Sequence, residues 1–264
     1  MSWTANQGVR FMNNLAAIFA NRIIAYTEDY AKNSPYLCRY KHKINVISPP
    51  VELPFVSAKK IREFAKKNNP NHQRPIIGMA ARFATEKGVE VLLEALNIII
   101  DKYPKVQVWF AGPYENIVGE ERYFKRLSPM IRDLLRKGNW RFLGVLGPQD
   151  MAMFYPNLNV LVVPSLNSTE AFGLVQIEAM MNDIPCIASD LPGVRQPVIR
   201  HKMGKIIPIG DSRALANSII AIIDNPSIYK VNTLAIKKQY DPQFIAEVYE
   251  KIFIEIHDEL VNSS

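Results

Sequence analysis

The chain has 264 residues, of which 48% are hydrophobic and 22% charged, and it contains 12 glycines, 18 prolines and two cysteines. This composition excludes a disordered chain, a collagen-like repeat and a disulfide scaffold, and it supplies enough apolar residues for a sizeable core. The net charge of +7 is compatible with nucleic acid, an anionic membrane surface or phosphorylated small molecules, and does not choose among them.

The first fifty residues predict little independent structure. They contain one amphipathic helix, strand-like runs at 22–26 and 44–47, and a helical stretch after Thr27. Asn13 and Asn14 interrupt the apolar region that a signal peptide would need. No segment offers the roughly 18 consecutive apolar residues of a membrane span, so we expect a soluble, cytoplasmic protein.

Cysteines and clustered cations add little to the prediction of function. Cys38 and Cys186 are far apart and belong to no Cys/His cluster, so we expect buried thiols without metal binding. Basic residues gather at 39–43 and 59–67. We interpret them as solvated helix faces, with weak peripheral contact to anionic lipid at the inner face of a membrane as the secondary alternative.

The segment from about 74 to 225 alternates short apolar runs with helical patterns, which is typical of βαβ units and a parallel sheet. Apolar residues on successive positions indicate strands covered on both faces. The expected strands are Ile76–Ala80, Val106–Ala111, Trp140–Leu143, Val160–Val163, Cys186–Ser189 and Lys205–Pro208. The expected helices between and after them are 89–99, 123–137, 151–155, 174–181 and 215–223.

Three domains follow from this pattern. Residues 1–50 are predicted to be a small N-terminal remnant with a linker, since prolines at 49, 50 and 54 indicate a stiff connection. Residues 51–240 are predicted to form the α/β domain. Residues 241–264 read as a long closing helix whose apolar stripe at Phe244, Val248, Ile252 and Ile256 needs a surface, and the N-terminal segment is the expected one.

The first cluster of candidate site residues is GMAARFATEKGVEVLLEA, from Gly78 to Ala95. Arg82 and Lys87 follow a predicted strand, and Gly88 precedes a predicted helix. Parallel α/β sheets bind ligands beyond the carboxyl ends of their strands, so both cations are expected to project into that crevice. A diphosphate would find there a guanidinium fork and an ammonium group. The alternative is two solvated loop cations.

The second cluster is PSLNSTEAFGLVQIEAM, from Pro164 to Met180. Glu170 lies in the loop after a predicted strand, Gly173 permits close approach of a ligand to the backbone, and Glu178 lies in the following helix. Two carboxylates at different depths of one cleft can hold two parts of a polyhydroxylated ligand. The alternative is an exposed Glu178 and a Glu170 favoured by the helix dipole.

These motifs resemble the donor-binding domain of GT-B glycosyltransferases, specifically the retaining glycosyltransferase family 4. The R-x-x-x-x-K-G loop and the E-x(7)-E motif EAFGLVQIE match, as do WRFLGVLGPQDMAMFY and SDLPGVRQPV. The resemblance covers about 74–225. Ala81 stands where many members of that family have glycine before the arginine. The fold so implied is α/β, a Rossmann-like doubly wound parallel sheet forming the C-terminal half of a GT-B protein.

The resemblance also implies roles for individual residues. Arg82 and Lys87 would bind the donor diphosphate, Glu178 the ribose hydroxyls, and Glu170 the donor sugar. No metal and no cofactor is implied, because the two cations take the place of a divalent ion. The remaining implied contacts with the donor come from the backbone of Phe172, Gly173, Leu174 and Val175, from Leu143 and Gly144 near the base, and from Gly193.

The implied activity is transfer of a glycosyl group from a nucleotide diphosphate sugar to an acceptor hydroxyl with retention. Residues 1–50 resemble only the end of the family's N-terminal acceptor domain, with RIIAYTEDYAK as its last strand and helix. We therefore expect a truncated enzyme, or one that needs a separate chain for the acceptor half. The alternatives are a non-catalytic nucleotide-sugar-binding module and a GT-B epimerase. Nucleic-acid binding has no module motif in its favour, and the acceptor is not identified.

Overall fold

The computed structural model describes residues 12–167 and 170–262. It divides into two compact units, one formed by Val51–Gln239 and the other by the segments 1–50 and 240–264. Residues 1–11 at the start of the predicted first helix, and Ser168 and Thr169 within the second motif, lie outside the described residues.

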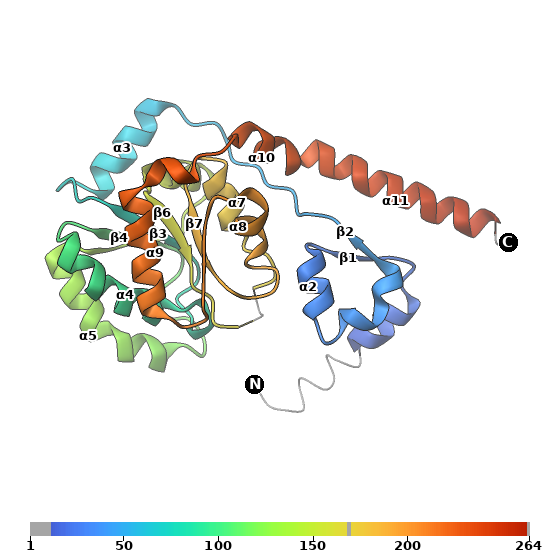
Figure 1. Cartoon of the computed structure of the whole chain (residues 1–264), viewed down its shortest axis with the longest axis horizontal. Helices are drawn as coiled ribbons and strands as arrows, with labels where there is room; N and C mark the ends of the chain where they lie inside the picture. Colours follow the sequence, from blue (N-terminus) through green and yellow to red (C-terminus); the bar gives the residue numbers. More distant parts are fainter. Residues whose placement is uncertain (1–11, 168–169, 263–264) are drawn as a thin grey trace. The chain divides into compact units, whose positions relative to one another are not determined.

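A six-stranded parallel sheet forms the centre of the larger unit (Figure 1). The strands lie in the order β5-β4-β3-β6-β7-β8, which is a doubly wound arrangement. From β3 the chain adds strands toward one edge of the sheet, and from β6 it adds them toward the other edge. All six predicted strands are confirmed to within one residue at each end. They are β3 (Ile76–Ala80), β4 (Gln107–Ala111), β5 (Trp140–Gly144), β6 (Val160–Val163), β7 (Cys186–Ser189) and β8 (Gly204–Ile207).

Helices connect the strands, and the five predicted in this unit are all present. Three further helices were missed, because α3 is dominated by lysines and α8 and α10 are only six and seven residues long. The helices are α3 (Ala58–Asn68), α4 (Val89–Lys102), α5 (Glu121–Lys137), α6 (Pro148–Phe154), α7 (Leu174–Met180), α8 (Gln196–His201), α9 (Ser212–Asp224) and α10 (Thr233–Gln239), with short 3-10 turns η2 (Thr85–Lys87), η3 (Tyr155–Asn157) and η4 (Pro226–Tyr229).

Alternating side chains of each strand enter the two layers that cover the sheet. Phe110 of β4 belongs to a buried cluster that includes residues of α4, α5 and α9. The neighbouring Trp109 contacts Phe64 of α3 and Phe154 of α6 through ring centroids 5.9 and 6.3 Å away. Burial on both faces explains why these strands are apolar at successive positions.

The smaller unit contains a two-stranded parallel sheet and a long helix. Strands β1 (Ile23–Ala25) and β2 (Ile44–Val46) pair in parallel, joined through α2 (Glu28–Asn33) and the 3-10 segment η1 (Leu37–Lys43). Helix α11 (Pro242–Asn262) packs Ile245 and Ile252 against Ile47. None of the helices that the structure describes is both long enough and apolar enough to cross a membrane.

Candidate donor-binding site

Two loops at the carboxyl ends of neighbouring strands form the candidate site. Strands β3 and β6 are adjacent, and the loops that follow them, 81–88 and 164–173, contain the two sequence motifs. The Leu166 amide donates a hydrogen bond of 2.9 Å to the carbonyl of Glu86, so the backbones of the two loops are directly joined. This junction lies where the sheet changes direction, the place at which doubly wound folds bind ligands.

Gly88 allows the two loops to approach this closely. Its φ of +70° lies in the left-handed region, and a Cβ built on it would lie 2.0 Å from the carbonyl oxygen of Pro164. Both the backbone conformation and the available space therefore require glycine here. Gly88 is also the N-cap residue of α4, so its conformation sets the direction of the chain between Lys87 and that helix.

Lys87 and Glu170 form the central contact of the site. Lys87 Nζ lies 2.6 Å from Glu170 Oε2, and the two side chains are 19% and 25% exposed. The other oxygen, Oε1, accepts a hydrogen bond of 3.1 Å from the amide of Gly173 at the start of α7. The carboxylate of Glu170 thus contacts both the cation of the first motif and the glycine of the second.

Arg82 is the more accessible of the two predicted cations. Its side chain is 57% exposed and forms an ion pair of 2.7 Å with Glu86, four residues along the same loop. The position agrees with the sequence prediction for a loop cation at this edge of the sheet. The ion pair between Arg82 and Glu86 contributes little to stability, because the Arg82 side chain is exposed to solvent.

Glu178 is half-buried in α7 and accepts a hydrogen bond from the hydroxyl of Tyr155 in η3. Burial raises the pKa of the Glu178 carboxyl, and the hydrogen bond from Tyr155 opposes that rise. Burial, followed by the charge of Glu178, also raises the pKa of Tyr155 well above its usual value, which keeps the phenol protonated as the donor. The alternative of a solvated, exposed Glu178 is therefore wrong.

The dipole alternative for Glu170 has partial support. Its carboxylate does accept from the amide that precedes α7, as an acidic residue at a helix start does. The contact with Lys87 is nevertheless the shorter one and joins residues 83 positions apart. Glu170 therefore connects the two loops in addition to its local role.

The other predicted contact residues all lie at the carboxyl edge of the sheet. Leu143 and Gly144 end β5, where the Gly144 carbonyl accepts a hydrogen bond of 2.7 Å from the Gly112 amide. Gly193 follows β7 with φ +85°. Around the start of α7, Phe172 and Gly173 are buried, Val175 is half-buried and Leu174 is exposed.

Tyr155 and Gln176 were not predicted as site residues. Gln176 is fully buried and donates to the carbonyls of Phe172 and Val194, which joins the loops after β6 and β7. A glutamine among the apolar residues of a short buried helix was a usable signal for such a role. Tyr155 gave none, because its partner Glu178 lies 23 positions further along the chain.

The described residues contain no candidate metal-binding cluster. They include no group of three or more His, Cys, Asp or Glu side chains arranged to hold an ion.

A doubly wound sheet with two cations in the loop after its first strand and two carboxylates after its fourth agrees with a domain of the GT-B type. The chain belongs to the family described as Glycosyl transferases group 1, which it matches over residues 60–239.

Individual relatives share this region at moderate identity. Phosphatidyl-myo-inositol mannosyltransferase of Mycobacterium leprae is 27% identical over 170 residues, which cover 63% of this chain and 42% of that protein. The capsular polysaccharide biosynthesis glycosyltransferase CapM of Staphylococcus aureus is 27% identical over 184 residues, which cover 67% and 45%. The chain thus spans less than half the length of these relatives.

Solved structures extend the likeness in fold to nearly the whole chain. Anabaena HepE, determined in complex with UDP and glucose, has a TM-score of 0.81 and 22% identity, covering 94% of this chain and 67% of HepE. At that identity the likeness establishes the fold alone.

Proposed function

We propose that this protein binds a nucleoside diphosphate sugar at the loops that follow β3 and β6 and transfers its glycosyl group to an acceptor hydroxyl. The observation that carries the proposal is the contact between the motifs: Lys87 of the first loop and Glu170 of the second are 2.6 Å apart. A cation and a carboxylate in contact at the switch point can receive the phosphate and sugar parts of one ligand.

The diphosphate would compete with Glu170 for Lys87. Without a donor, the ammonium of Lys87 and the guanidinium of Arg82 are each neutralised by a carboxylate, Glu170 and Glu86 respectively. A diphosphate offers these cations more acceptor oxygens and more negative charge. The exchange would free Glu170 from Lys87, and its carboxylate could then accept hydrogen bonds from the sugar hydroxyls.

The chemical step would be stabilised electrostatically. When the glycosidic bond to the diphosphate breaks, negative charge develops on the departing phosphate oxygen. Lys87 is held in place by the short η2 turn and by Gly88, so its charge would need little rearrangement at that moment. Retention at the anomeric carbon is the stereochemistry implied by the resemblance to glycosyltransferase family 4. The proposal uses no metal ion.

Glu178 would hold the ribose. A carboxylate can accept hydrogen bonds from two vicinal hydroxyls, and the Glu178 carboxylate is already oriented by Tyr155. Leu143 and Gly144 would lie beside the base, Gly193 near the sugar, and the backbone of 172–175 near the phosphates. The relatives support a hexosyl donor and a lipid-linked or polysaccharide acceptor, since their names include a mannosyltransferase and a capsule biosynthesis enzyme.

Isothermal titration calorimetry with UDP and with GDP tests the proposal. We expect binding of at least one nucleotide, weakened strongly by Arg82→Ala and by Glu178→Ala. Arg136→Ala is the matched control, because Arg136 is also an exposed arginine paired with a nearby carboxylate, Asp133, and it lies at the end of α5 that leads into the amino end of β5, at the opposite edge of the sheet from both loops. Wild-type affinity in both site variants would overturn the assignment.

The second candidate is a donor-binding module that acts with a separate acceptor-binding chain. The favouring observation is that the smaller unit leaves the large apolar side chains of Ile18, Phe19 and Phe253 53%, 80% and 64% exposed. Contact with a partner chain would remove such side chains from water, which is favourable. Donor hydrolysis or glycosyl transfer by the purified chain alone would refute dependence on a partner.

A further inference from the structure

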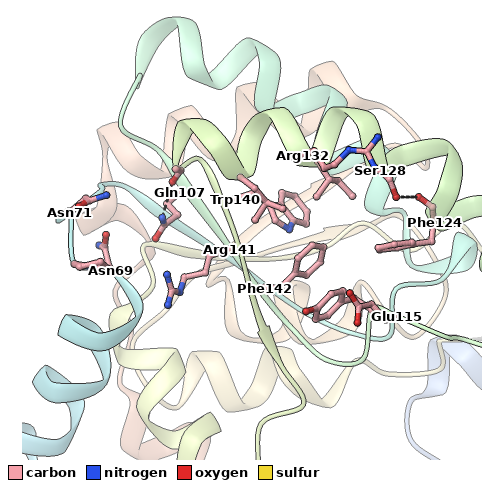
Figure 2. Close-up of a pocket in the computed structure, with 15 residues that line it drawn as sticks. Asn69, Asn71, Gln107, Glu115, Phe124, Ser128, Arg132, Trp140, Arg141 and Phe142 are labelled. Carbon is pink, nitrogen blue, oxygen red and sulfur yellow. Dashed lines mark hydrogen bonds between the residues drawn. The ribbon is translucent and has the colours of Figure 1, made fainter.

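The open edge of the central sheet borders a groove that the donor-site proposal does not use. Strand β5 is the terminal strand and pairs only with β4 among the described residues. A groove of about 620 Å³ runs along it (Figure 2), with α5 on one side and the 69–71 loop on the other. We call this the edge groove.

The strand register determines which backbone groups face the groove. The amide of Val108 in β4 donates to the carbonyl of Asn139 at 2.8 Å, and Val108 is paired with Trp140. In a parallel ladder with this pattern, the peptide groups of Arg141 face β4, whereas those of Trp140 and Phe142 face away. Two N–H and two C=O groups therefore border the groove, and none has a backbone partner in the described part of the chain.

Three polar side chains of the groove are already hydrogen-bonded within the protein. Both ends of the Asn69 amide bond to Gln73, and the Gln107 amide bonds to the Gly138 carbonyl and to the Trp109 indole. Ser128 donates to the Phe124 carbonyl. The side-chain donors still available include Trp140 Nε1 and Arg141 Nε, which are buried and have no hydrogen-bond partner among the described residues. The unpaired strand edge adds backbone donors and acceptors in a row beside them.

The charge of the groove favours an acidic occupant. Arg132 on α5 forms no ion pair or hydrogen bond with any described residue, and Arg141 contributes only a 3.3 Å contact to the Lys67 carbonyl. These arginines lie on opposite sides of Trp140 in Figure 2, and Glu115 is the one carboxylate among the lining residues. Helix α5 has six basic and two acidic residues, so two copies of the chain joined through this edge would repel.

We propose that the edge groove receives an acidic, extended segment of another polypeptide, which adds to β5 as a seventh strand. Its backbone would pair with the peptide groups of Trp140 and Phe142, the mode called β-augmentation. Side chains of a strand alternate between faces, so two adjacent carboxylates would meet Arg132 on the α5 face and Arg141 on the opposite face.

Amide hydrogen exchange of the full chain, resolved by NMR, tests the proposal with a peptide probe. The probe is acetyl-Val-Glu-Glu-Val-Thr-Val-amide, and the controls are the same peptide with lysines in place of glutamates and a version N-methylated at alternate residues. We expect the acidic peptide to slow exchange at Trp140 and Phe142. Exchange at Arg141 should not change, because its amide already faces β4. Neither control peptide should have an effect.

A charge reversal separates this site from general attraction to a basic surface. Arg132→Glu should weaken the acidic peptide about tenfold or more, whereas Arg122→Glu on the same helix should not. The proposal is overturned if the acidic peptide leaves Trp140 and Phe142 unprotected, if Arg132→Glu has no effect, or if the lysine peptide protects equally. Protection that rises with protein concentration in the absence of peptide would instead identify a second copy as the occupant. No sugar nucleotide enters the experiment, so its outcome is independent of the donor-site proposal.

Discussion

Replacing Tyr155 by phenylalanine removes the hydrogen bond that its hydroxyl donates to the Glu178 carboxylate. Tyr155 is fully buried, so phenylalanine keeps the ring in its packed position and deletes only the hydroxyl. Hydrogen bonds to charged groups contribute about 1.5 to 3 kcal/mol. Because Glu178 is half-buried and water can replace part of the bond, we expect the lower end of this range. Because the bond already exists in the free protein, this value sets an upper limit of roughly tenfold on the loss in affinity for a nucleotide sugar.

The pH dependence gives this variant a more specific signature. Burial raises the pKa of Glu178 and the Tyr155 hydrogen bond lowers it, so Tyr155→Phe should raise that pKa further. The ribose clamp needs the ionised carboxylate, and binding should therefore fall on acidification at a higher pH in the variant than in the wild type. The difference in unfolding free energy should be largest above both pKa values and should shrink as Glu178 becomes protonated.

Calorimetry across a pH series measures both effects, using a nucleotide sugar in place of a nucleoside diphosphate to avoid titration of a terminal phosphate. Tyr103→Phe is the matched control, because Tyr103 also donates to a carboxylate, that of Asp224, but on the surface. A Tyr155→Phe variant with wild-type affinity and an unchanged acid limb would refute the positioning role.

Three further variants test other contacts. Lys87→Ala should weaken nucleoside diphosphate binding by about 1.5 to 3 kcal/mol. The effect should exceed that of Arg82→Ala, because the Lys87 side chain is 19% exposed and that of Arg82 57%. Calorimetry showing the reverse order would contradict this reasoning. Gly88→Ala should lower the unfolding free energy by more than about 1 kcal/mol, because the φ of Gly88 is positive and the Pro164 carbonyl oxygen lies where the Cβ would be. Gly147→Ala is the control and should be tolerated, since a Cβ there meets no atom within 4 Å. Equal denaturation midpoints for the two variants would contradict this prediction. Ile252→Ala should destabilise the smaller unit by about 2 to 5 kcal/mol, because Ile252 is buried against Ile47. Phe253→Ala should have little effect, since the Phe253 side chain is 64% exposed. Similar thermal shifts for the two variants would argue against the packing of α11.

The parallel sheet was predictable because the clearest strands, β3, β6 and β7, are apolar at successive positions and α4 and α9 between the strands have an apolar stripe. Helix α3 was not, since lysines and an arginine outnumber the apolar residues, of which only Phe64 is a buried hydrophobic. The edge position of β5 had a sequence signal in the charged Arg141 within the strand, since charged side chains are common on edge strands, but the order of the inner strands had none. Strand order depends on which helix packs on which face, and that is a tertiary property.

The candidate site was predictable to the extent that it depends on local sequence. Arg82, Lys87, Glu170 and Glu178 could be located by their position after a strand or within a helix. The bond between Tyr155 and Glu178 and the pairing of Lys87 with Glu170 join residues far apart in sequence. A spacing pattern contains no information on such contacts, so the partner of each charged group came from the structure alone.

The hydrogen bond between the Leu166 amide and the Glu86 carbonyl constrains how the two loops of this protein can be engineered. The loops meet at this bond and at the Gly88–Pro164 approach, so the backbone of 86–88 is matched to that of 164–166. Grafting a single loop from a relative with a different donor preference would break that match. Chimeras should therefore exchange 81–88 and 164–173 together, as one cassette.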